Sequence, residues 1–257
     1  MSDLVAEEVK SFVTRAIILA AGVGSRLRPL TDDRPKCLLE VGGRMIVDHQ
    51  LDTLGRYGIT DVIVVVGYCG DQIRRHLGGR VRYIDNDRYE RTNSLYSLWL
   101  ARDELVSGTL ILNSDVLAPP LLFAQLLEAP ALDAILVEQG DAFEAEDMKV
   151  MLEGSHVVDF GKDLPPERAH AHNVGVAKFS AEGASRLADC LERLVATGHE
   201  NDWVPVAFRE FASHWSLTAV LTDGLPWIEI DYVSDLMRAR LEIEPAILAL
   251  ETAVSVQ

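Results

Sequence analysis

Residues 15–41 read RAIILAAGVGSRLRPLTDDRPKCLLEV. The apolar run Ala16–Ala20 contains two adjacent isoleucines and is followed by glycines, which is typical of a buried parallel strand that leads into a loop. In that loop, Gly22 and Gly24 would let the backbone approach an anion closely, with N–H groups pointing at it. The same short segment supplies positive charge through Arg26, Arg28, Arg34 and Lys36. The stretch therefore predicts a site that holds phosphate groups.

Two better-known glycine-rich loops do not fit this stretch. A Walker A loop ends in Gly-Lys-Ser or Gly-Lys-Thr, whereas the pair Lys10-Ser11 has no glycine before it, and a Rossmann fingerprint has a third glycine or alanine where Leu27 stands. The residues AAGVGSRLRPLT, followed by RPKCLLEV, instead resemble the signature of nucleotidyltransferases, which join a nucleoside triphosphate to a phosphorylated small molecule and release pyrophosphate. The alternative is a surface loop with glycine turns and solvated basic residues.

The composition is that of a globular protein with an acidic surface. The chain has 257 residues, of which 48% are hydrophobic and 25% charged, so one domain over residues 1–257 can bury a sizeable core. A formal net charge of −16 disfavours nucleic-acid or anionic-membrane partners. Residues 1–14 are interpreted as an N-terminal extension without a signal peptide, and no apolar run reaches transmembrane length, so a cytoplasmic protein with reduced cysteines is expected. The sequence leaves a homodimer open.

Alternating strand and helix patterns predict an α/β fold. A helix over 45–57 ends at Gly58 and leads to the apolar strand 61–66, and further strands and helices follow. This alternation predicts a Rossmann-like, mostly parallel (mixed) sheet with helices on both faces. The segment from about 140 to 173 contains acidic residues and a short hairpin, and it predicts a small substrate-side lobe over the sheet edge. Near the C-terminus, Pro245 is expected to separate two helical segments.

Two aspartates directly follow apolar strands, where ligands bind in open α/β sheets. Asp115 lies in ILNSDV and Asp231 in WIEIDY. Magnesium prefers one or two carboxylates together with waters and phosphate oxygens, so both aspartates are predicted to hold Mg²⁺, as the resemblance also implies. The alternative is that each caps the following helix. Glu229 would share a face with Asp231 if the strand runs that far, which makes it an additional candidate ligand or else a solvated carboxylate.

The resemblance also implies catalytic and nucleotide-binding residues around the loop. Lys36, a compact cation suited to phosphate, would contact the acceptor's phosphate or the α-phosphate of the nucleotide. Arg26 would hold the β- and γ-phosphates and neutralise the leaving group. The nucleotide-binding loop would comprise Ala20, Ala21, Gly22 and Gly24.

Three further stretches indicate which branch of the nucleotidyltransferases the chain resembles. Residues 86–102 read NDRYERTNSLYSLWLAR, residues 113–115 read NSD, and residues 229–236 read EIDYVSDL. Together they resemble the cytidylyltransferases that activate phosphocholine and their relatives acting on phosphonates such as 2-aminoethylphosphonate. In such enzymes the NSLYS stretch lies near the nucleotide, so Asn93 and Ser94 are candidates for nucleotide binding. The alternative is that they simply form the N-cap of a helix.

The acceptor is expected to contact residues from the second half of the chain. The resemblance extends to Lys149 and Lys162, which would suit an acceptor rich in negative charge, such as a phosphonate dianion, although both could be solvated surface lysines. Trp203 is a candidate for an aromatic box around a choline head group, as are Trp227 and Tyr232. Such aromatic residues more often fill a core.

These patterns together imply CTP-dependent transfer of CMP to a small phosphonate or phosphate ester, with release of pyrophosphate and with Mg²⁺ as cofactor. One alternative is a sugar-1-phosphate nucleotidyltransferase that uses UTP, dTTP or GTP. Another is a catalytically silent nucleotide-binding regulatory subunit. The presence of Lys36, Asp115 and Asp231 together argues against that silent subunit.

Overall fold

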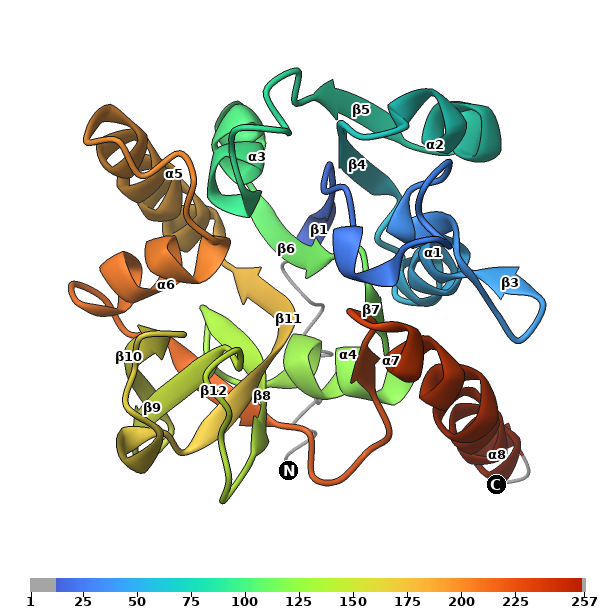
Figure 1. The fold of residues 1–257 in the computed structure, drawn as a ribbon. Coiled ribbons are helices and arrows are strands. Elements are labelled where there is room, and N and C mark those ends of the chain that lie inside the picture. The colour runs from blue at the N-terminus through green and yellow to red at the C-terminus, as the bar shows by residue number, and fades with distance from the viewer. Residues whose placement is uncertain (1–12, 256–257) are drawn as a thin grey trace, which may run out of the picture.

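A mixed β-sheet with helices on both faces organises the molecule (Figure 1). The structure is a computed structural model that describes residues 13–255, so most of the expected N-terminal extension lies outside the described residues. Within this range the main sheet has nine strands in the order β5-β4-β1-β6-β11-β8-β12-β10-β9. The predicted α/β fold with a mixed sheet is therefore confirmed, but the sheet is not mostly parallel, because four of the eight neighbouring pairs in this order are antiparallel.

The parallel half of the sheet is built around the first strand. It comprises β1 (Val13–Ala20), β4 (Asp61–Val66), β5 (Arg82–Asp85) and β6 (Gly108–Asn113). Strand β1 lies between β4 and β6, so that Ile17 is level with Ile63 on one side and Ile111 on the other. This central position explains why residues 16–20 are almost entirely apolar.

The other half of the sheet is largely antiparallel. It comprises β8 (Ala134–Gln139), β9 (Lys149–Glu153), β10 (His156–Gly161), β11 (Ala171–Phe179) and β12 (Thr218–Leu221). The predicted hairpin forms as β9 and β10, and β9 also pairs with β11, so these five strands close on themselves. The segment expected to form a substrate-side lobe is thus continuous with the main sheet.

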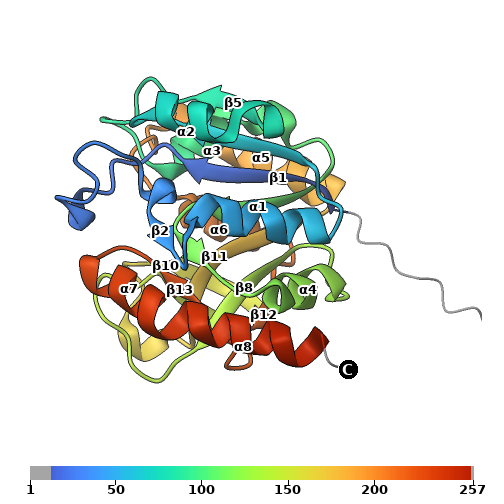
Figure 2. The same ribbon diagram turned by 90° about the vertical axis from the view of Figure 1, so that its right-hand side faces the viewer.

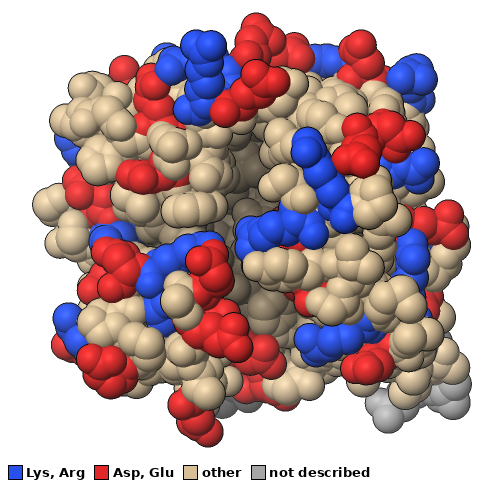
Figure 3. Space-filling model, viewed as in Figure 1, with Lys and Arg blue, Asp and Glu red and all other residues tan. Residues whose placement is uncertain are grey.

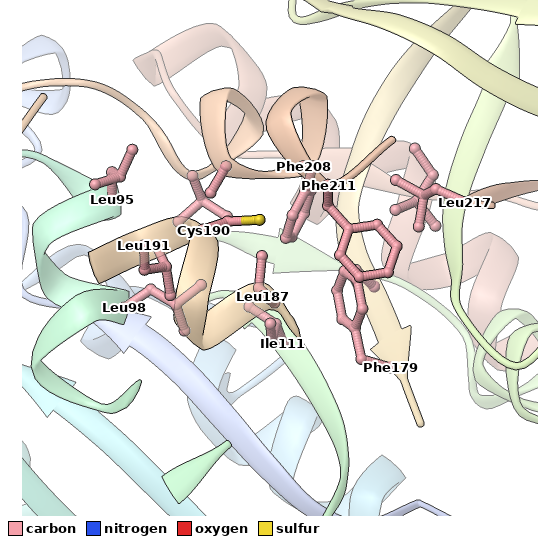
Figure 4. Packing of buried hydrophobic residues seen from close by; sticks show 14 of the residues in the cluster. Leu95, Leu98, Ile111, Phe179, Leu187, Cys190, Leu191, Phe208, Phe211 and Leu217 are labelled. Atoms are coloured by element: carbon pink, nitrogen blue, oxygen red, sulfur yellow. The ribbon is translucent and has the colours of Figure 1, made fainter. Parts of the chain in front are cut away.

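Helices cover the two faces in two groups (Figure 1). One face carries α3 (Ser94–Leu100), α5 (Ala181–Ala196) and α6 (Val204–Ala212), and the other carries α1 (Ile46–Arg56), α2 (Gly70–Leu77) and α4 (Pro120–Glu128). Side chains of β1 alternate between the two cores: Ile17 joins the first, Ile18 the second. In the first core, Phe179 of β11 packs against two residues of α6, with its ring centroid 5.4 Å from that of Phe208 and 5.2 Å from that of Phe211 (Figure 4).

The C-terminal helices pack beside α1 over a third, smaller core (Figure 2). They are α7 (Val233–Arg238), a π-helical turn over Ala239–Ile243, and α8 (Glu244–Ser255). The two expected helical segments form as α7 and α8, but a π-helical turn separates them, and Pro245 is the second residue of α8. The π-helical turn immediately before it loosens the hydrogen-bond ladder, which accommodates a residue without an N–H.

Several short elements complete the described fold. Two small antiparallel sheets lie outside the main sheet: β2 (Glu40–Val41) pairs with β3 (Arg44–Met45), and β7 (Val116–Leu117) pairs with β13 (Ile228–Glu229). The 3₁₀ turns span Ser25–Leu27, Lys36–Leu38, Gly78–Arg80, Arg102–Glu104 and Pro166–Arg168. All three cysteines are free thiols, as expected. None of the helices described is long and apolar enough to cross a membrane.

Candidate active site

A cleft of about 990 Å³ opens where the parallel strands end (Figure 3). Its walls come from the loops after β1 and β6, from the segment before β9, and from the chain around β13. Figure 3 shows the hollow in the middle of this face, with basic and acidic side chains both at its border. The cleft therefore lies at the edge of the sheet where the sequence predicts a ligand.

The glycine loop after β1 presents main chain to the cleft. Gly24 has a φ of 64°, in the left-handed region that favours glycine, and its carbonyl accepts a hydrogen bond from the Thr31 hydroxyl at 2.8 Å. At Gly22 nothing lies within 4 Å of where a Cβ would stand, so this part of the backbone borders open space. An anion can therefore approach the main chain closely at Gly22.

Lys36 connects the loop to the two predicted aspartates. Its ammonium donates to Asp115 Oδ2 at 2.7 Å and to Asp231 Oδ1 at 2.5 Å. Burial alone would lower the pKa of Lys36, but the two carboxylates hold that pKa above its usual value. Burial would likewise raise the pKa of Asp231, but Lys36 and Arg26 bring it below its usual value. The lysine is therefore a fixed positive charge, and Asp231 is a fixed negative one.

The pairing of β7 with β13 brings the two aspartates together. Glu229 pairs with Val116, and Ile230 N–H donates to the Asp115 main-chain oxygen at 3.0 Å. Neither aspartate caps a helix: Asp115 precedes β7, and Asp235, not Asp231, accepts the hydrogen bonds at the start of α7. Both carboxylates are thereby left to face Lys36.

Arg26 lies beside the same cluster. Its guanidinium forms an ion pair with Asp231 Oδ2 at 3.0 Å and lies over the Tyr232 ring, 5.2 Å from the centroid. Because Arg26 is about 41% exposed, it can move to meet a ligand in the cleft.

Glu229 lies in the cluster as a half-buried carboxyl. Burial, with Asp115 and Asp231 nearby, raises the pKa of Glu229 to about 8, and the Asn113 side-chain amide donates to its Oε1 at 3.4 Å. Among residues 13–255, no group of three or more His, Cys, Asp or Glu side chains is arranged to hold a metal ion. A role for Glu229 as an additional metal ligand stays a prediction.

The donor set suits a magnesium ion that takes its other ligands from a substrate. Asp115 Oδ1 is buried and has no hydrogen-bond partner within the part of the chain that the structure describes, and Asp231 stands on the other side of Lys36. Two carboxylates without a full protein cage are what Mg²⁺ uses when phosphates complete its coordination. The residues fit the predicted ion.

Asn93 and Ser94 lie at the cleft, and both also have structural contacts. The Asn93 side chain accepts from Ser94 N–H at 2.8 Å as the N-cap of α3, and Ser94 Oγ accepts from Val204 N–H at 3.0 Å. The capping interpretation is therefore observed, while both residues still line the cleft. Nucleotide binding by them stays a prediction.

The other predicted residues divide into those at the cleft and those outside it. Ala21, Lys162 and Trp203 line it, and Lys162 Nζ lies 4.7 Å from the centroid of the Trp203 ring and 2.9 Å from Glu146 Oε2. Ala20 does not line the cleft, because it is the last residue of β1 and packs into a core. Lys149 is buried at the start of β9, so it cannot reach a ligand in the cleft.

Two groups of cleft residues were not predicted from the sequence. One is the acidic loop, defined here as residues 144–147, which brings Glu144, Glu146 and Asp147 to the wall. The other is a polar network at the opposite end, where the Asn86 amide donates to Thr92 Oγ1 at 3.2 Å and to Ser97 Oγ at 3.0 Å. The acidic run EAED at 144–147 was a usable signal, whereas the network depends on tertiary contacts.

The sequence of the chain matches a family of nucleotidyltransferases. Residues 16–193 match the MobA-like NTP transferase domain, and the chain belongs to this family. The prediction that the chain is a nucleotidyltransferase is confirmed, and the matched range contains the glycine loop, Lys36 and Asp115.

Two relatives and one solved structure show the range of similarity. A CTP:phosphoglutamine cytidylyltransferase of Campylobacter jejuni is 28% identical over 246 residues, covering 86% of this chain and 97% of the relative. A 2-aminoethylphosphonate cytidylyltransferase of Lancefieldella rimae is 28% identical over 229 residues, covering 87% and 90%. The structure of a CTP:phosphocholine cytidylyltransferase from Streptococcus pneumoniae superposes with a TM-score of 0.76 at 24% identity, covering 88% of this chain and 97% of that one. This superposition confirms the predicted fold class.

Proposed function

We propose that the protein transfers CMP from CTP to a small phosphate or phosphonate and releases pyrophosphate. The observation that carries this proposal is the Lys36 ammonium, held at the cleft by Asp115 and Asp231. A cation beside two carboxylates and an open glycine loop suits a nucleoside triphosphate. The choice of CTP is supported by the cytidylyltransferase relatives, which match this chain over most of its length.

The chain's own residues would act on charge that moves during the reaction. An acceptor oxyanion attacks the α-phosphorus; its new P–O bond forms as the bond to the β-phosphate oxygen breaks, and the electron pair leaves with pyrophosphate. Lys36 would face the charge on the α-phosphate, and Arg26 would face the leaving pyrophosphate. Because the acceptor is already an anion at neutral pH, we assign no general base.

Asp115 and Asp231 would hold a magnesium ion, whose positive charge stabilises the phosphates. Removal of divalent ions with EDTA should abolish pyrophosphate release, and added Mg²⁺ should restore it. Calorimetric titration of Mg²⁺ into the protein with CTP, compared with an Asp115→Asn variant, tests the ligand assignment without measuring turnover. Equal Mg²⁺ binding by both proteins would contradict that assignment.

The acceptor is proposed to carry a positively charged amine or quaternary ammonium group at the end away from its phosphorus. Lys162 is neutralised by Glu146, and Lys149 lies outside the cleft, so the two predicted lysines leave little net positive charge there. The acidic loop adds Glu144 and Asp147 to the same wall. A zwitterion such as 2-aminoethylphosphonate, or phosphocholine, matches this distribution better than a purely anionic acceptor.

The test is pyrophosphate release with Mg²⁺, each of four nucleoside triphosphates, and a panel of acceptors. The panel contains 2-aminoethylphosphonate, phosphocholine, ethylphosphonate and hexose-1-phosphates. We expect release with CTP and an acceptor that carries an amine or quaternary ammonium, and much less with ethylphosphonate, which lacks a cationic group. Release only with a hexose-1-phosphate would transfer the protein to the sugar-nucleotide branch, and no release with any pair would favour the silent regulatory subunit.

A further inference from the structure

Lys149 is a buried lysine whose ammonium faces main chain rather than a carboxylate. It is the first residue of β9, and it is only 1% exposed. Its Nζ donates to the main-chain oxygens of Glu144 at 3.1 Å, Ala145 at 3.4 Å and Asp147 at 3.3 Å. The carboxylates nearby are engaged elsewhere, since Glu146 pairs with Lys162 and Asp147 faces His172.

The three hydrogen bonds match what an ammonium requires. A lysine ammonium has three N–H donors and no acceptor, and here three carbonyl oxygens receive them. A buried charge without partners is costly, so the ammonium and the three carbonyls favour one mutual arrangement. The contact therefore fixes the path of the main chain as well as the position of the lysine.

Lys149 links the acidic loop to the rigid sheet. It is level with Gly161 of β10 and with His172 of β11 in the strand pairings. The loop's own hydrogen bonds are local: Glu144 N–H donates to Asp147 Oδ2 at 2.7 Å, and Asp147 N–H donates to the Glu144 main-chain oxygen at 3.3 Å. These local bonds shape the loop, whereas the lysine, together with the contact between Asp147 and His172, ties it to the sheet.

The loop presents its side chains to the cleft. Glu144, Glu146 and Asp147 all line the wall, and Glu146 orders Lys162 against the face of Trp203. A shift of the loop's main chain would therefore move three carboxylates and, through Glu146, a lysine.

We infer that Lys149 is a positioning residue for the acceptor: its ammonium holds the main chain of residues 144–147 so that the loop's carboxylates face the acceptor's amine. This inference rests on the proposed function, because it needs an acceptor in this part of the cleft. Lys149 itself touches neither substrate.

The test compares Lys149→Met with a matched control, Lys178→Met. Lys178 of β11 is also a buried lysine that donates to main-chain oxygens, those of Leu127 at 3.3 Å and Ala129 at 2.7 Å, but its ammonium lies at the C-terminal end of α4, outside the cleft. Lys149→Met should raise the KM for 2-aminoethylphosphonate or phosphocholine by about tenfold or more, a loss of roughly 1.4 kcal/mol or more in binding, while the KM for CTP stays unchanged. Lys178→Met should change neither KM.

A second measurement needs no substrate. Hydrogen exchange of the amides of residues 144–148 should be faster in Lys149→Met than in the natural protein, and unchanged in Lys178→Met. If Lys149→Met does not fold, Lys149→Gln can take its place. Glutamine keeps two donors, so the rise in the acceptor KM and in the exchange rate should both be smaller than those expected for Lys149→Met. An unchanged acceptor KM, or equal losses for CTP and acceptor, would overturn the inference.

The two proposals can fail separately. If the natural protein shows no cytidylyltransferase activity but exchange in the loop still depends on Lys149, the proposed function is wrong while the tether to the sheet stands. If activity is found and the loop exchanges equally in both proteins, the positioning inference is wrong and the proposed function stands.

Discussion

The Lys36 ammonium carries the positive charge at the centre of the site. We expect Lys36→Met to lower kcat by about 100-fold or more, because a preorganised positive charge would be lost where negative charge develops. Steady-state pyrophosphate release with CTP measures this. Arg28→Met is the matched control, since Arg28 is a basic residue of the same loop, pairs with Asp32 at 3.4 Å and does not line the cleft. Equal kcat values in the two variants would contradict the assignment of Lys36.

Lys178 should make the free energy of unfolding depend on pH. Burial lowers the pKa of Lys178 from its ordinary value of 10.5 to about 8. Between these values the unfolded chain binds more protons than the folded one, so the free energy of unfolding should rise with pH, by up to roughly 3 kcal/mol in all. Urea unfolding at about pH 7.5 and about pH 9.5 measures the rise, with Lys178→Met as reference. A rise of the same size in the variant would show that another group causes it.

Some of these side chains could be predicted from the sequence and others could not. Asp115 and Asp231 could, because a carboxylate that directly follows an apolar strand must emerge at the sheet edge. The burial of Lys149 could not be predicted. A lysine beside an acidic run can be solvated or buried against main-chain carbonyls, and the sequence pattern is the same in both cases. Burial of that kind is decided by tertiary packing, which the local sequence does not record.

At the scale of elements, the start of α7 fixes one wall of the site. Asp235 Oδ2 accepts from Asp231 N–H at 3.0 Å and from Tyr232 N–H at 2.7 Å, which orients the chain that carries Asp231. Asp235→Ala should lower the free energy of unfolding by about 1 kcal/mol, as expected for loss of a cap, and should also lower kcat by displacing Asp231. Asp235→Asn keeps an acceptor oxygen and should retain most of the stability in urea unfolding. Full stability in Asp235→Ala would show that these bonds do not hold the helix.

Element boundaries follow the sequence wherever the pattern is local. The helix predicted over 45–57 forms as α1 at Ile46–Arg56, and the strand predicted over 61–66 forms as β4, because hydrophobic periodicity alone defines both. The pairing of β7 with β13 is different, since each strand has only two residues and they come from distant parts of the chain. No periodicity can be seen in so short a strand, so the bridge that joins the aspartates appears only in the fold.

At the scale of the whole molecule, the cleft joins the two halves of the sheet. Its walls come from the parallel half through the loops after β1 and β6, and from the antiparallel half through the acidic loop and Trp227. A nucleotide that binds only the folded state should therefore stabilise both halves together, by about 2.7 kcal/mol at a hundredfold excess over its Kd. We expect CTP with Mg²⁺ to raise Tm by roughly 5 to 10 °C in one cooperative transition. An equal shift with ATP or GTP would contradict selection of CTP.

The pairing of β7 with β13 also determines when, during folding, the active site becomes complete. Because contacts between distant parts of a chain form against a large loop-closure entropy, the sheet around β1, β4 and β6 can assemble before the C-terminal segment arrives. Asp115 then has no Asp231 beside it until Glu229 pairs with Val116. A polypeptide still emerging from the ribosome would have its glycine loop, yet it would gain the ability to turn over substrate only after the segment with Glu229 and Asp231 had been synthesised.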